Sequence, residues 1–317
     1  MSRNYNLGSR DMGRAGQMAL NSAAQSGAVS YSTAATNGER WGEFAQFARD
    51  ELGVKYMEKV TPEGVIAYGE ALQEKVSAGE MSAATAQNYV SAVNSVMNLA
   101  TEGKWESVSP TKDCGIDHRS GIASENKAIS AEKHAEIGVA VSDRLSAILD
   151  LQRELGLRFE ESVKIDAGKA LSEAQERGNV TIDAGTKGGL KRTVPASPQA
   201  VAALERAATI QGGDRSLIPA SNSYREFQQA AYAELREAGG SGFHGERHAY
   251  AQARYEAIAG APAPIVAGWS RGERLDRLAE ALGVSKEEAK AKDEEARIQV
   301  AKELGHGRTE VTNAYLG

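Results

Sequence analysis

The fold and the chemistry of this chain are decided by two stretches near its end. The first is Phe243-His244-Gly245-Glu246-Arg247-His248, and the second is Glu303-Leu304-Gly305-His306-Gly307-Arg308, followed by Asn313-Ala314-Tyr315-Leu316-Gly317. A further arginine, Arg158, stands upstream after Leu155-Gly156-Leu157. Arginine binds phosphate oxygens through paired hydrogen bonds, histidine can move a proton, and tyrosine can act as a covalent nucleophile. This combination predicts chemistry on a phosphodiester.

The chain of 317 residues is long enough for two domains with substantial cores. No apolar run reaches the length needed to span a bilayer, so no membrane association is expected. The first twenty residues lack the apolar core of a signal peptide, and we therefore expect a cytoplasmic protein. The single cysteine, Cys114, excludes an internal disulfide framework and a cysteine-based zinc cluster.

The net charge of −6 argues against a uniformly basic nucleic-acid-binding protein. Local basic surfaces remain compatible with it. Lys187, Lys191 and Arg192 form one such block, and we take Lys191 and Arg192 as candidate DNA contacts. Any DNA binding is then expected to depend strongly on salt and to use focused positive patches.

Residue patterns divide the chain into four parts. Residues 1–35 are rich in small and polar side chains and are predicted to be a flexible arm. Apolar residues at helical spacing, with Ser and Thr caps, predict three helices within 41–52, 62–76 and 82–100, in a domain over 36–105. Glycine and proline interrupt the pattern over 106–127, which is predicted to be a linker. The last part is a domain over 128–317.

The last domain is predicted to be mainly α with a small β-sheet. A helix is expected to begin after Ser130 and to continue to Leu155. Short strands are expected at 163–166, 179–183 and 191–195, with 185–189 as a hairpin turn between the last two. Further helices are expected within 197–208 and 224–235 and after Arg247. The strongly charged stretch near 260–295, where Ser285 and Glu288 form a capping box, is predicted to be a helical insertion.

Four segments in fixed order resemble the tyrosine recombinases, the family of phage-type integrases. Gly156-Leu157-Arg158-Phe159-Glu160-Glu161 is similar to the family's first arginine box, and 186–195 resembles its β-hairpin lysine box. His244-Gly245-Glu246-Arg247-His248 is similar to its H-x-x-R-H box, and Leu304-Gly305-His306 with Tyr315 resembles its final histidine and nucleophile. One box alone is a weak signal, but all of them in this order are a strong one. The resemblance covers roughly 130–317, and the helices before the linker resemble the family's SAM-like core-binding domain.

The resemblance implies a role for each residue. Tyr315 would attack the phosphorus, Arg158 and Arg247 would hold the nonbridging oxygens, and His306 would add a third donor. Lys187 would protonate the leaving oxygen, its position in the turn favouring it over Lys191. His244 would assist proton transfer or phosphate binding. Two supporting residues are expected: Glu161, which would orient an arginine or histidine, and His248, which would pack against the site.

The implied function is site-specific breakage and rejoining of duplex DNA through a 3′-phosphotyrosyl intermediate, in integration, excision or resolution of mobile DNA. Neither a metal nor another cofactor nor ATP is expected, because the arginines would stabilise the charge and the tyrosyl link would conserve the bond energy. The expected partner is double-stranded DNA with a specific site, bound by monomers that form a tetramer on it. The two domains would clamp the duplex. The interval between Arg247 and His306 is longer than is usual in the family, and no helix follows Tyr315 to dock on a neighbouring subunit.

Three alternatives remain open. A type IB topoisomerase would use the same transesterification to relax DNA without a fixed site. A catalytically inactive relative would bind DNA and form no covalent adduct. A helical scaffold unrelated to DNA would leave the ordered boxes unexplained.

Overall fold

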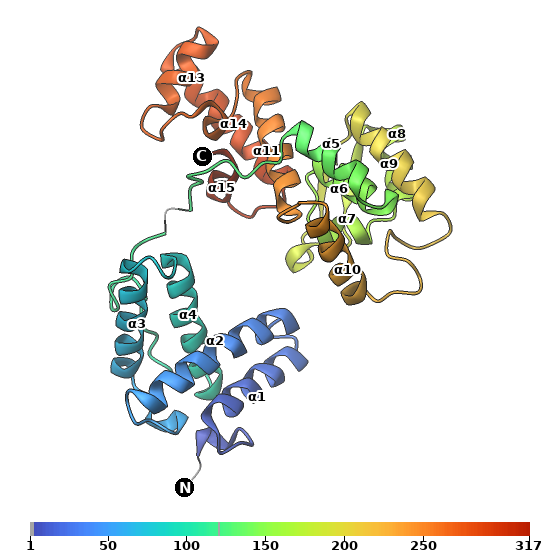
Figure 1. Ribbon diagram of the computed structural model, residues 1–317. Helices are drawn as coiled ribbons and strands as arrows, with labels where there is room; N and C mark the ends of the chain where they lie inside the picture. Colours follow the sequence, from blue (N-terminus) through green and yellow to red (C-terminus); the bar gives the residue numbers. More distant parts are fainter. Residues whose placement is uncertain (1–2, 120) are drawn as a thin grey trace. The chain divides into compact units, whose positions relative to one another are not determined.

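The computed structural model describes residues 3–119 and 121–317 and divides the chain into two compact units, Met1–Ser120 and Gly121–Gly317 (Figure 1). The described residues are mostly helical, with a two-stranded sheet in the second unit, which confirms the predicted fold class. Within these residues, no helix is both long enough and apolar enough to cross a membrane.

The first unit is a helical bundle whose main helices begin at side-chain caps. Asp11, Ser30, Thr61 and Ser82 each accept a hydrogen bond from the backbone three residues on, which satisfies an otherwise free N–H group. Its elements are η1 (Asn4–Asn6), α1 (Met12–Gln25), α2 (Tyr31–Asp50), η2 (Met57–Lys59), α3 (Pro62–Ser77) and α4 (Ala83–Ala100).

The prediction of a flexible arm over 1–35 is wrong for most of its length. Helix α1 packs on α2, with Met12 and Leu20 buried, and the indole of Trp41 donates a hydrogen bond to the Met12 carbonyl at 3.0 Å. Gly16 allows this approach, because a Cβ there would lie 2.1 Å from the indole nitrogen. The buried stripe consists largely of alanine and glycine, which give a weak hydrophobic signal. Residues 1–2 of the predicted arm and 120 of the predicted linker lie outside the described residues.

The predicted linker begins too early. Val108, Cys114 and Ile116 are buried in the core of the first unit. Asn94 of α4 also donates a hydrogen bond to the Val108 carbonyl at 2.8 Å. Beyond Gly121 the chain belongs to the second unit, where the Ala123 amide donates to the Asn313 carbonyl at 2.9 Å.

The helices of the second unit are α5 (Ala131–Ala140), α6 (Asp143–Leu155), α7 (Phe159–Lys164), α8 (Ala167–Arg177), α9 (Pro198–Gln211), α10 (Tyr224–Glu237), α11 (His244–Ala259), α12 (Pro264–Ala267), α13 (Arg274–Leu282), α14 (Lys286–Glu303) and α15 (Asn313–Leu316). Its core is formed chiefly by α6, α9, α11 and α14. Figure 1 shows α11, α14 and α15 side by side within this unit. The sheet pairs β1 (Asn179–Ile182) with β2 (Arg192–Pro195), and the short turns are η3 (Lys187–Gly189) and η4 (Thr309–Thr312).

Strands β1 and β2 are antiparallel, with Asn179 opposite Pro195 and Ile182 opposite Arg192. The hairpin was predicted, but the strand predicted at 163–166 is wrong. Residues 159–164 form helix α7, because the Glu161 side chain accepts a hydrogen bond from the Arg158 amide and closes the first turn. The single helix predicted from Ser130 to Leu155 is also wrong, since Ser142 caps a second helix there.

The charged stretch near 260–295 contains α12, α13 and most of α14. Leu278 and Ala289 pack with Ala261 in a small cluster of their own, which Trp269 partly covers. The capping box is confirmed: Ser285 accepts from the Glu288 amide, and Glu288 accepts from the Ser285 amide. Helix α14 then continues into the main core of the unit.

Candidate active site

Tyr315 lies inside the second unit, with only 6% of its surface exposed. Two contacts hold the short helix α15 that carries it. Gln252 of α11 donates a hydrogen bond to the Tyr315 carbonyl at 3.2 Å. Arg297 of α14 donates to the Asn313 side chain at 2.8 Å. Tyr315 is therefore fixed from both helices.

The Tyr315 hydroxyl faces the first turns of α11. His244 Nε2 lies 2.9 Å from it, and Arg247 Nε donates to it at 3.4 Å. The His248 ring stacks on the phenol at a centroid distance of 4.5 Å and an angle of 34°, and the His306 ring lies 5.4 Å away. His244, Arg247 and His248 meet Tyr315 together because residues three and four apart share one face of a helix.

Arg247 is completely buried. Its guanidinium donates to the carbonyls of Gly156 and Leu304 and approaches His306 Nε2 at 3.5 Å. Burial lowers the pKa of Arg247 to about 10, so the group stays charged at neutral pH. Gly156 ends α6 with φ of +60°, and a Cβ there would lie 2.5 Å from the Tyr250 ring, so both its conformation and its surroundings favour glycine.

Glu161 organises a second pair of arginines. It receives two hydrogen bonds from Arg192, at 2.6 and 2.7 Å, and one from Arg158 at 2.8 Å, and it is fully buried. Burial favours the neutral carboxyl, but the bonds and charge of Arg192, together with those of Arg158, outweigh it and lower the pKa of Glu161. Arg247 lies 3.9 Å from the same carboxylate. Three guanidinium groups thus gather around one anion, which leaves the cluster positive.

The C-terminal end of α14 completes this cluster. Arg192 donates to the Glu303 carbonyl at 2.7 Å, while Arg247 and Arg158 both donate to the Leu304 carbonyl. Free carbonyls at a helix C-terminus carry partial negative charge and attract cations. These contacts fix the turn that leads to His306, two residues further on.

The histidines of the cluster are held in their neutral form. Burial and the nearby Arg247 and Arg158 lower the pKa of His306 to about 3 and also lower that of His244. Burial with the neighbouring His244 lowers the pKa of His248 to about 4. A neutral His244 can accept the phenol proton at Nε2. His306 accepts from Arg247 at Nε2, which places its proton on Nδ1, a buried atom with no hydrogen-bond partner among the described residues.

The integrase family matches residues 118–253, which include Arg158, the hairpin, His244 and Arg247. This segment, less than half of the chain, is therefore similar to the integrase family. None of the curated proteins matches the chain.

Solved structures show the same fold over nearly the whole chain. The XerH site-specific recombinase bound to its palindromic difH substrate, after cleavage, has a TM-score of 0.56 at 14% identity, covering 96% of this chain and 81% of that one. The same recombinase before cleavage has a TM-score of 0.52 at 14% identity, covering 95% and 80%. A lambda integrase (residues 75–356) dimer bound to a COC′ core site has a TM-score of 0.51 at 16% identity, covering 92% and 94%.

The β1–β2 hairpin departs from the sequence-based expectation at Arg192. This residue was expected to contact DNA, but only 8% of it is exposed, and its three nitrogens donate to Glu161 and to the Glu303 carbonyl. In β2 it shares the buried face with Val194, while Thr193 is exposed. The alternation of a strand is the signal that could have placed Arg192 inside.

The other two basic residues of the hairpin lie outside the cluster. Lys187 is exposed in the turn, and no hydrogen bond or ion pair forms on its ammonium within 3–119 and 121–317. Lys191 is also exposed, with its side chain 3.8 Å from Asp183. The cluster thus brings together eight residues: Arg158, Glu161, Arg192, His244, Arg247, His248, His306 and Tyr315.

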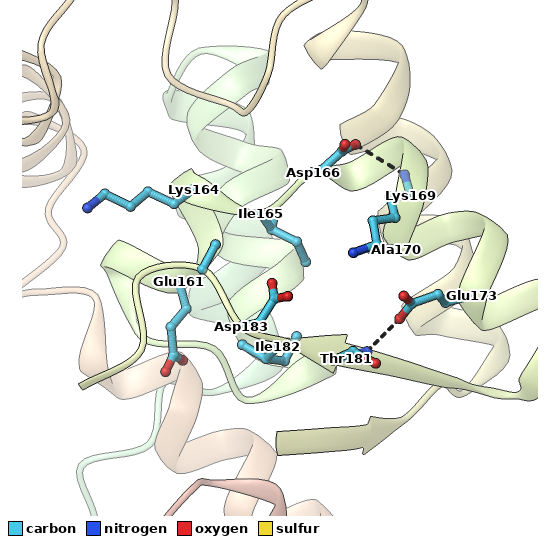
Figure 2. A pocket seen from close by; sticks show the side chains of 11 residues that line it. Glu161, Lys164, Ile165, Asp166, Lys169, Ala170, Glu173, Thr181, Ile182 and Asp183 are labelled. Carbon is cyan, nitrogen blue, oxygen red and sulfur yellow. Dashed lines mark hydrogen bonds between the residues drawn. The ribbon is translucent and has the colours of Figure 1, made fainter. Parts of the chain in front are cut away.

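A separate cavity of about 100 Å³ lies between α7, α8 and β1, as Figure 2 shows. Its polar groups already stabilise the local fold. Asp166 caps α8 by accepting from the Lys169 amide at 3.1 Å, and Glu173 accepts from the Thr181 amide of β1 at 2.8 Å. Of the clustered residues only Glu161 reaches this cavity, so the cavity is not part of the cluster.

Proposed function

We propose that this protein is a site-specific tyrosine recombinase that cuts and rejoins duplex DNA, with Tyr315 as nucleophile. The observation that carries the proposal is the phenol of Tyr315, placed 2.9 Å from a neutral histidine and within reach of a buried guanidinium. A base that accepts the proton and a cation that stabilises the oxyanion are the two groups that activate such a nucleophile.

In the proposed first step, the Tyr315 oxygen attacks the phosphorus while His244 Nε2 receives the phenol proton. Arg158 and Arg247 stabilise the charge on the nonbridging oxygens, with His306 as a further donor. The bond between phosphorus and the 5′ oxygen breaks, and Lys187 gives that oxygen a proton. The product is a 3′-phosphotyrosyl link and a free 5′ hydroxyl.

In the second step, a 5′ hydroxyl attacks the phosphotyrosyl link, the Tyr315 oxygen leaves and takes back its proton from His244, and the DNA strand is resealed. The link conserves one phosphodiester bond, so the balanced sequence requires no external energy source. Lys187 takes the proton from the attacking hydroxyl in this direction, since the steps are the reverse of each other.

The proposed substrate is double-stranded DNA with a specific recombination site, acted on in the cytoplasm. The XerH and lambda integrase structures of this fold are bound to such DNA sites, which supports the choice of substrate. Exchange between two duplexes requires four strand cuts, and we therefore propose a tetramer on DNA formed from monomers. Integration, excision or resolution of mobile DNA would all use this reaction.

A nicked suicide substrate tests the proposal, because loss of the short cleaved strand traps the covalent adduct. Site DNA drawn from sequence flanking the gene should give an adduct with the wild-type protein and none with Tyr315→Phe. Tyr232→Phe, a partly exposed tyrosine of the same unit, is the matched control and should react normally. Adduct formation by Tyr315→Phe would disprove the assignment. Efficient relaxation of a plasmid without the site would favour a topoisomerase, and binding without adduct an inactive relative.

A further inference from the structure

A row of alternating charges lies behind the first turn of α11, on the side away from Tyr315. Glu246 stands between His244 and Arg247 in the sequence and is fully buried. Its carboxylate faces α5 and α6. His134 Nδ1 of α5 lies 2.9 Å from one oxygen, and Arg153 of α6 donates to the other at 2.7 Å. Asp150 of α6 lies 3.1 Å from His134 Nε2.

His134 is bonded to carboxylates at both ring nitrogens. Since carboxylates only accept hydrogen bonds, both nitrogens must donate, and the ring is an imidazolium. The bonds to Asp150 and Glu246 raise the pKa of His134 to about 9, against the opposing effects of burial and of Arg153. Asp150 is bonded in turn by Arg206 of α9 at 2.9 Å, and Glu154 of α6 also lies near the row.

The position of Glu246 links this row to the site. His244 and Arg247 face Tyr315 from one side of α11, and Glu246 leaves the same turn toward α5 and α6. A rigid helix turns as one body, so fixing Glu246 fixes the direction of both catalytic side chains. The Ile129 amide also donates to the Gly245 carbonyl at 3.3 Å, which holds this turn to the segment just before α5.

We infer that His134 is a positioning residue: its imidazolium holds the buried Glu246 and thereby sets where α11 presents His244 and Arg247 to the scissile phosphate. This inference rests on the proposed function. Replacing the imidazolium with a neutral group leaves Glu246 short of one charged partner in a buried place, and the first turn of α11 shifts. Small displacements of catalytic groups reduce rate strongly while affecting substrate binding little.

His134→Gln tests the inference by removing the charge, and His134→Lys tests it by retaining the charge. In single-turnover cleavage, His134→Gln should lower the rate about 10- to 100-fold, with the Kd for site DNA within about twofold of wild type. His134→Lys should recover at least part of the rate. His118→Gln, at an exposed histidine of the first unit, should change neither. Equal rates for wild type and His134→Gln, or equal losses in both His134 variants, would overturn the inference.

Nuclear magnetic resonance titration of His244 in the DNA-free protein gives a readout that does not depend on cleavage. His134→Gln should move the pKa of His244 back toward its ordinary value, because the ring would leave its place beside the arginines; an unchanged titration would contradict the positioning role. A wild-type protein that forms no adduct would instead disprove the proposed function, and this titration would still decide the inference.

If His134→Gln does not fold, the pH dependence of cleavage is compared between the wild type and His134→Lys. The wild-type cleavage rate should then fall as pH rises through about 9, and that of His134→Lys should fall only at higher pH; identical profiles would overturn the inference.

Discussion

The arginine cluster and the hairpin turn of the second unit differ in how their functional groups are held. Arg158, Arg192 and Arg247 are bonded to Glu161 and to backbone carbonyls, and Arg247 is fully buried. Lys187, in the turn between β1 and β2, is exposed. The groups proposed to stabilise charge on phosphate are thus held in place by contacts within the protein, whereas the proposed proton donor has no such contact among the described residues. The two regions should respond differently to substitution.

Arg247→Ala should have the largest effect on cleavage. Loss of a guanidinium that stabilises a phosphoryl transition state reduces the rate by about 10³–10⁴-fold, or roughly 4–5 kcal/mol. Single-turnover cleavage of a suicide substrate measures the effect, and Arg158→Ala should fall in the same range. Arg277→Ala, on the exposed face of α13, is the control and should cleave normally. Substantial cleavage by Arg247→Ala would show that folding does not place this group at the phosphate.

Glu161→Gln should destabilise the second unit. It leaves buried guanidinium groups without their anion, and breaking such a pair costs about 3–5 kcal/mol. Its neighbour provides the control: Glu160 pairs with Lys164 at the surface with 43% of its side chain exposed, and Glu160→Gln should cost less than about 1 kcal/mol. Urea unfolding measures both variants. Similar losses in the free energy of unfolding for the two variants would mean that the buried arginine cluster is held no more firmly than the surface ion pair.

Lys187→Ala should leave stability unchanged within about 0.5 kcal/mol and lower cleavage about 100-fold. A substrate with sulfur in place of the leaving 5′ oxygen sharpens this test, because a thiolate leaves without a proton. Such a substrate should restore the rate of Lys187→Ala and leave that of Arg158→Ala low. Lys191→Ala is the matched control and should cleave normally while losing some DNA affinity at higher salt. A defect in Lys191→Ala that the sulfur substrate restores would transfer the proton donor to Lys191.

The smallest expected effect is on the pH dependence of stability. His248 is buried in its neutral form with a pKa of about 4, whereas the unfolded chain takes up a proton near its ordinary value of 6.5. Stability is therefore complete above 6.5 and falls as pH decreases toward 4. His248 should contribute a loss of roughly 1.5 kcal/mol between pH 6.5 and 5, and His248→Phe should reduce the wild-type loss by that amount while the part due to the buried His244 and His306 remains. Urea unfolding over this range measures it, with His118→Gln as a control that should keep the wild-type dependence.

Local patterns predicted the features of the fold that depend on neighbouring residues. Capping residues and helical periodicity located α3 and α4, and the glycine-containing turn located the β1–β2 hairpin. Helix α1 was missed because its buried face is built of small side chains that reveal their packing only against Trp41. Helix α7 was mistaken for a strand because its one turn depends on a cap from Glu161.

The residues of the candidate site were predicted from their type and order, but the residues that hold them by hydrogen bonds were not. Tyr315, His244 and Arg247 were expected to converge, and the structure brings them together. The bond from Arg192 to Glu161 and the bonds from the arginines to the Leu304 carbonyl join distant segments, so no local pattern announces them. The same is true of His134 and Glu246, which lie 112 positions apart in the sequence.

The contacts of Arg158 and Arg247 with the Leu304 carbonyl have a consequence for substrate binding. Both guanidinium groups have already exchanged water for a protein oxygen during folding. In the proposed reaction, an arriving phosphate would replace or join an existing acceptor and would not have to strip water from a hydrated cation. Little solvent then has to rearrange as charge develops on the phosphate. The free energy of dehydrating the two arginines is spent during folding and lowers the stability of the DNA-free protein.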